Sequence, residues 1–88
     1  MTIQDSEIRV EILRQVEICG ADKSICPSEV ARALAPSWHG LMNQVRTVAI
    51  GLAGEQRIDI LRKGKPVEPE GVKGVIRLRL KPGSAPEN

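Results

Sequence analysis

The 88-residue sequence contains almost no aromatic residues: Trp38 stands alone, and phenylalanine and tyrosine are absent. Proteins that hold single-stranded nucleic acid stack bases on several aromatic side chains, so this class is disfavoured. The two cysteines, Cys19 and Cys26, are too few for a disulfide framework. We expect them to be reduced thiols in a cytoplasmic protein, because the sequence has no signal peptide and no apolar run near the about 18 residues of a membrane span.

Sequence motifs for catalysis and metal binding are also missing. The chain has no glycine-rich phosphate loop, zinc motif or nucleophile elbow. The single histidine, His39, has no carboxylate or hydroxyl residue at a spacing that would indicate a catalytic pair. A metal ion bound by Cys19, Cys26 and His39 would have only three protein ligands, and Cys19 belongs to an apolar helix face. We therefore expect neither an enzyme nor a cofactor.

The first half of the chain predicts two helices. Apolar residues recur at helical spacing over residues 6–19, namely Ile8, Ile12, Leu13, Val16 and Cys19. The stretch "CPSEVARAL" starts a second, short helix, with Pro27 at the first helical position and Glu29 two residues later. This helix must end near Ala35, because Pro36 disfavours helical geometry in the residue before it. Between these helices, Ile25 is expected to form a brief strand.

A third helix is predicted over residues 38–53. Its apolar face is the clearest in the chain and consists of Trp38, Leu41, Met42, Val45, Val48, Ala49 and Leu52. The opposite face is expected to carry His39, Asn43, Gln44, Arg46, Thr47 and Ile50. Trp38 heads the apolar stripe and is expected to pack in the core.

The remaining sequence changes from helical to alternating periodicity. "RIDILR" places Ile58 and Ile60 on one strand face, and "VIRLRL" places Arg77 and Arg79 outward. The segment 63–74 between them is rich in glycine and proline, and we expect a long loop between antiparallel strands. Residues 1–81 then form a single domain, and residues 82–88 are expected to be a disordered tail.

The predicted fold is α+β. Three helices pack on a small antiparallel β-hairpin in the order α-β-α-α-β-wing-β, which is the order of a winged helix-turn-helix domain. Alternation in the last third excludes a four-helix bundle.

Three stretches carry a resemblance to a known family: "CPSEVARAL", "SWHGLMNQVRTVA" and "IDILRKGKPVEPEGVKGVIRLRL". Over residues 6–80 the chain resembles a small bacterial family of uncharacterised winged-helix proteins, a domain of unknown function. The resemblance implies the winged-helix fold and no established activity. It also implies that a basic residue often follows the tryptophan, a place that His39 holds here.

Charge is distributed unevenly along the chain. The first 40 residues carry a net charge of −2, whereas residues 41–88 carry +4. Residues 57–81 include eight basic and three acidic side chains. Such a basic region attracts phosphates. We therefore predict that the protein binds double-stranded DNA, with helix 38–53 in the major groove and the wing, residues 62–74, on the backbone. The predicted contact residues are His39, Asn43, Gln44, Arg46, Thr47, Arg62, Lys63, Lys65, Lys73, Arg77 and Arg79.

Other interpretations of the same residues remain open. The polar residues of helix 38–53 also suit an ordinary solvated face, and charged residues on exposed strands deter aggregation. The modest net charge of +2 is compatible with a protein-interaction module on the same fold. Recognition of duplex RNA by shape is a third alternative. The free chain is expected to be a monomer, because it has no long extra helix for dimerisation.

Overall fold

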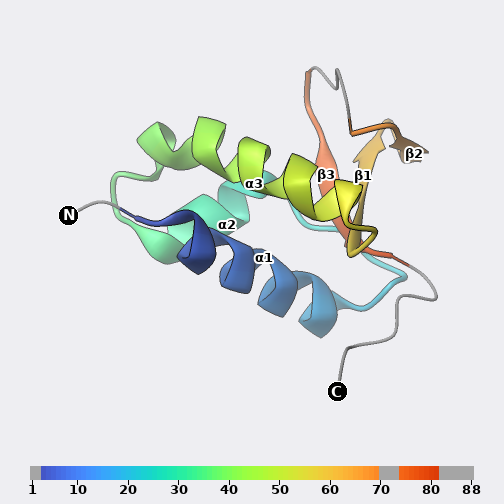
Figure 1. The fold of residues 1–88 in the computed structure, drawn as a ribbon, viewed down its shortest axis with the longest axis horizontal. Coiled ribbons are helices and arrows are strands. Elements are labelled where there is room, and N and C mark those ends of the chain that lie inside the picture. The colour runs from blue at the N-terminus through green and yellow to red at the C-terminus, as the bar shows by residue number, and fades with distance from the viewer. Residues whose placement is uncertain (1–2, 70–73, 82–88) are drawn as a thin grey trace.

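A computed structural model describes residues 3–69 and 74–81. Within these ranges the chain forms three α-helices and a three-stranded antiparallel sheet (Figure 1). The helices are α1 (Asp5–Cys19), α2 (Pro27–Leu34) and α3 (Met42–Gly54), and the strands are β1 (Ile58–Arg62), β2 (Lys65–Val67) and β3 (Arg77–Leu80). The predicted α+β class is confirmed. The expected tail, residues 82–88, lies outside the described residues.

Helix α2 begins as its sequence predicts. The backbone N–H of Cys26 donates a hydrogen bond of 2.8 Å to the Glu29 carboxylate, and Pro27 occupies the first helical position. The hydrogen bond to Glu29 gives a partner to a backbone N–H that the start of a helix otherwise leaves without one. The helix ends at Leu34, two residues before Pro36.

The third helix differs from the expected helix 38–53. Residues Trp38–Leu41 form a 3₁₀ turn, η1, and the α-helix starts only at Met42. Gly40 lies inside this turn and has low helix propensity, which favours a short tight turn over a regular helix. Ile50 was expected on the polar face, but it is partly buried and packs against the core. Helix α3 contacts α1, α2 and β1, so its apolar contact surface is wider than one stripe.

The sheet has the strand order β2-β1-β3 and corrects the expectation of a two-stranded hairpin with a long loop. Strand β1 turns directly into β2 through Lys63 and Gly64, which have φ angles of 55° and 81°. Two residues with positive φ form the tight turn whose twist matches that of paired strands. Ile25 forms an isolated antiparallel bridge with Leu78, as the expected brief strand requires.

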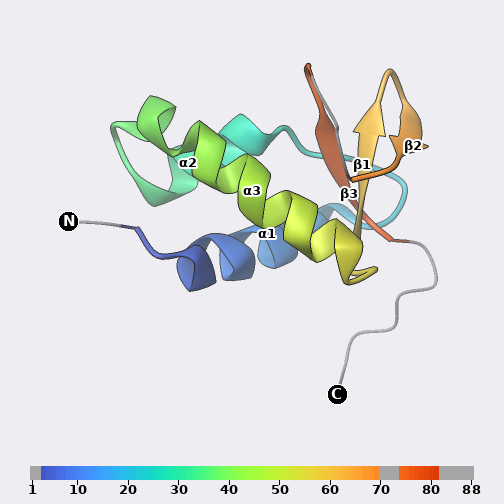
Figure 2. The ribbon, with the colours of Figure 1, turned by 45° about the horizontal axis from the view of Figure 1, so that its top comes forward.

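One hydrophobic core joins the helices to one face of the sheet. Figures 1 and 2 show the sheet beyond one end of the helices, close to the C-terminal ends of α1 and α3. The fully buried side chains come from every helix and from β1 and β3; they include Ile8, Ile12, Val30, Val45, Leu52, Ile60 and Leu78. In the part of the chain that the structure describes, no helix is both long enough and apolar enough to cross a membrane.

Candidate nucleic-acid interface

Two of the predicted contact residues, Asn43 and Thr47, lie one turn apart on the exposed side of α3. The Thr47 hydroxyl donates a hydrogen bond of 3.0 Å to the backbone carbonyl of Asn43. This bond uses the hydroxyl proton inside the helix. Gly51, one turn further, is also exposed and a Cβ built on it meets open space. These three exposed positions of α3 therefore present the amide group of Asn43 and no large side chain.

Gln44 has a structural partner at the start of α1. Its amide nitrogen lies 2.9 Å from the carbonyl oxygen of Ile3 and 2.8 Å from a carboxylate oxygen of Asp5. Both amide hydrogens can be used in these bonds. Gln44 thus ties α3 to the residues that precede and open α1, and its predicted role in base contact stays a prediction.

Arg46 connects α3 to the sheet. Its Nη1 donates a hydrogen bond of 2.8 Å to the carbonyl oxygen of Gly74, just before β3. The Arg62 guanidinium comes from β1 and also lies over Gly74: Nη2 is 3.0 Å from the position that a Cβ would occupy there. Gly74 has a φ angle of 81°, which favours glycine. Arg46 of α3 and Arg62 of β1 therefore meet at one glycine.

The hairpin itself presents exposed cations. Arg62, Lys63 and Lys65 are all exposed, and they flank or form the turn between β1 and β2. Figure 2 shows that this turn and the start of β3 lie at the same end of the sheet, as the pairing of Leu61 with Arg77 requires. Lys73, another predicted contact residue, lies outside the described residues.

Arg77 and Arg79 project from the sheet face opposite the helices, where both have protein partners. Arg77 donates hydrogen bonds of 2.7 and 2.9 Å to the side chain and carbonyl of Ser24. Arg79 forms a 2.9 Å ion pair with Asp59, which is its cross-strand neighbour and also lies 3.4 Å from Lys81. Asp59 offsets part of the positive charge that the sequence places on this face.

His39 stands apart from the other predicted contact residues. It is exposed in η1, at the end of α3 that is remote from the sheet in Figure 1. Its ring stacks on Trp38 with 3.8 Å between the ring centroids, and the Arg32 guanidinium lies 5.3 Å from the Trp38 ring centroid. Trp38 is partly buried against the core. The cluster packs against the 3₁₀ turn, at the end of α3 opposite the sheet.

The sequence did not single out Gly74 and Ser24, which hold two of the predicted contact residues. Gly74 accepts the bond from Arg46, and Ser24 orients Arg77. The glycine before an alternating strand was a usable signal, because an isolated glycine there often marks a special backbone conformation. Ser24 gave no comparable signal.

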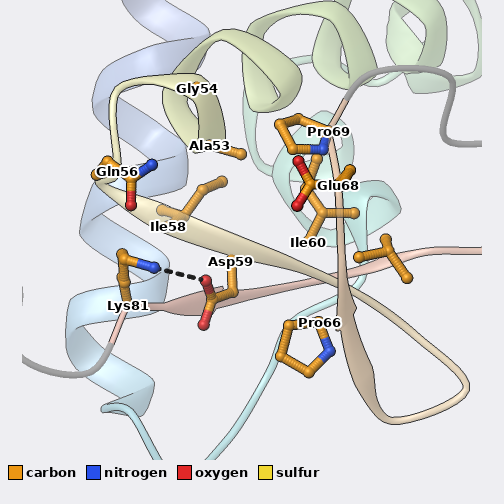
Figure 3. A pocket seen from close by; sticks show the side chains of 11 residues that line it. Ala53, Gly54, Gln56, Ile58, Asp59, Ile60, Pro66, Glu68, Pro69 and Lys81 are labelled. Atoms are coloured by element: carbon orange, nitrogen blue, oxygen red, sulfur yellow. Dashed lines mark hydrogen bonds and ion pairs between the residues drawn. The ribbon is translucent and has the colours of Figure 1, made fainter.

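A hollow of about 480 Å³ lies beside the end of α3, as Figure 3 shows. Ala53, Ile58 and Ile60 line its apolar part, and the Lys81–Asp59 pair lies at its edge. No serine, cysteine or histidine is among its described lining residues. Across residues 3–69 and 74–81, no three histidine, cysteine or acidic side chains come together to hold a metal ion.

Residues 5–81 match the family described as "Protein of unknown function (DUF3253)". The chain belongs to this family. The resemblance to a domain of unknown function is thereby confirmed, and the match includes α1, α2, α3 and the whole sheet. No curated protein matches the sequence. Because the family description assigns no activity, the case for a function depends on the geometry of α3 and the hairpin.

Proposed function

We propose that this DUF3253 domain is a winged helix-turn-helix protein that binds duplex DNA, with α3 in the major groove and the β1–β2 hairpin on the phosphate backbone. The observation that carries the proposal is the hydrogen bond between Arg46 and Gly74. It joins α3 to Gly74, just before β3, and the guanidinium of the hairpin residue Arg62 lies over the same glycine. A helix and a basic hairpin held side by side can contact a groove and its bordering phosphates together.

The element order supports the winged-helix interpretation. Helix α2 precedes η1 and α3, and the bridge between Ile25 and Leu78 adds a short strand position beside β3. Helix α3 would then be the recognition helix of the motif. The pair β1 and β3 would carry the wing, with β2 as an additional strand within it.

The proposal divides the contact residues into two groups. Asn43 and Thr47 face outward on α3 and would meet base edges, since asparagine pairs with adenine and the threonine methyl contacts thymine. Arg62, Lys63 and Lys65 would contact phosphates. Gln44 and Arg46 would chiefly hold α3 in place, because each has intramolecular hydrogen bonds. Contacts from His39, Arg77 and Arg79, a monomeric state and a cytoplasmic location remain predictions.

Exposed apolar side chains favour a second candidate, a protein-interaction module. Val10 and Ile18 on α1 are 66% and 71% exposed. With Gln44 and Arg46 held by internal bonds, α3 also has few free groups for reading bases. A protein partner would bind with a weaker salt dependence than duplex DNA.

The experiment that separates the two candidates is a salt titration. Fluorescence anisotropy would follow binding of a labelled duplex of about 20 base pairs between about 50 and 200 mM salt, where each phosphate contact contributes a slope of about −0.9 in log–log form. We expect Lys63→Gln to make the slope less negative by about 0.9. The matched control is Lys23→Gln, in the segment between α1 and α2, which should leave the slope unchanged.

Two results would argue against the proposed mode of DNA binding. One is the absence of binding to duplex DNA at the lowest salt concentration. The other is an equal change of slope in Lys63→Gln and Lys23→Gln, which would mean that the domain responds to total charge and not to the hairpin.

A further inference from the structure

A second hollow, of about 450 Å³, lies on the face of the sheet opposite the helices. Leu61 and Val75 provide its apolar surface. Leu61 is 6% exposed and forms a fixed floor, whereas Val75 is 83% exposed. Val75 is thus a large exposed apolar side chain beside an apolar floor. Covering it with another apolar group is favourable, because this removes apolar surface from water.

Three cations surround this apolar surface: Arg62, Lys63 and Arg77. The Arg77 guanidinium is held by its two hydrogen bonds to Ser24, and Arg77 is the cross-strand neighbour of Leu61. It therefore reaches the rim in a fixed orientation. A guanidinium that is already ordered loses little conformational entropy when it binds a carboxylate.

None of the described residues lining this hollow is acidic. The hollow is therefore a basic groove with an apolar floor, which we call the outer groove.

We propose that the outer groove binds an acidic peptide segment that inserts one apolar side chain between Leu61 and Val75. Charge complementarity selects an acidic occupant, because three cations, Arg62, Lys63 and Arg77, line the groove. The apolar floor selects a peptide over a phosphate backbone, since phosphates gain nothing from Leu61 and Val75. This proposal does not depend on DNA binding, although a bound peptide would compete with DNA for Arg62 and Lys63.

The test measures the affinity of the full chain for two labelled 12-residue peptides. The salt concentration is about 150 mM, at which long-range electrostatic attraction is largely screened. Each peptide has a central residue flanked by three glutamates on either side within a glycine–serine sequence. That residue is leucine in one peptide and serine in the other. We expect the leucine peptide to bind several-fold more tightly. Val75→Ser should remove this difference, and Arg77→Gln should weaken both peptides.

Val10→Ser on α1 is the matched control, because Val10 is a similarly exposed valine that does not line the groove. It should leave both affinities unchanged, and thermal unfolding would establish that each variant folds. Equal binding of the two peptides would overturn the proposal and leave only a cationic surface. Equal effects of Val75→Ser and Val10→Ser, or no binding of either peptide, would overturn it as well.

Discussion

At the residue scale, one ion pair links the two longest helices. Arg9 of α1 donates two hydrogen bonds, of 2.9 and 2.6 Å, to the carboxylate of Glu55, which follows the end of α3. The hydrogen bond from Arg9 lowers the pKa of Glu55 below its ordinary value of 4.5. Both side chains are well exposed, at 38% and 49%, so solvent screening keeps the stabilisation small.

The lowered pKa of Glu55 predicts how stability depends on pH. A carboxyl group with a lowered pKa in the folded state stabilises the protein above about pH 4.5, and this contribution is lost as the pH falls through the folded pKa. We expect Glu55→Gln to lower the melting temperature slightly at about pH 7 and this difference to become smaller at about pH 2, because protonation of Glu55 removes the ion pair with Arg9. Circular dichroism melts at both pH values measure this. An equal difference at both would contradict the assignment.

At the scale of elements, the turn between β1 and β2 decides the shape of the hairpin. Lys63 and Gly64 both adopt positive φ angles. Glycine adopts this conformation without strain, whereas lysine does not. The turn fixes the register that pairs Arg62 with Lys65 and so places the hairpin cations. The hairpin geometry thus depends on a single glycine.

A pair of glycine substitutions tests the turn. Gly64→Ala should lower the free energy of unfolding by about 1–2 kcal/mol, because alanine is strained at a φ angle of 81°. Gly51→Ala, at an exposed helical position with open space around it, should raise the free energy of unfolding by about 0.5–1 kcal/mol. Urea denaturation of both variants gives the two values. A neutral Gly64→Ala would mean that the turn relaxes at no cost.

The sequence predicts elements well where a local pattern governs them. The helical spacing of α1, the Cys26–Glu29 cap and the alternation in β3 were all visible in the sequence and are present in the structure. Strand β2 was missed because its three residues, including Pro66, have no strand pattern of their own and depend on pairing with β1.

At the scale of the whole molecule, long-range contacts arrange the candidate interface. Gln44 reaches Ile3 over 41 residues, and Arg46 reaches Gly74 over 28. The sequence placed both side chains on a polar helix face but gave no sign of these partners, because no local pattern relates residues so far apart. It consequently predicted a larger set of base-contacting residues than the structure leaves exposed on α3.

The central claim is that α3 and the hairpin form one surface for duplex DNA. Amide NMR shifts of the labelled protein, followed during titration with duplex DNA at low salt, test it most directly. The account predicts the largest shifts at Asn43, Thr47 and residues 62–65, with Val10 and Ile18 of α1 unchanged. Shifts confined to α1, or no shifts at any residue, would contradict it.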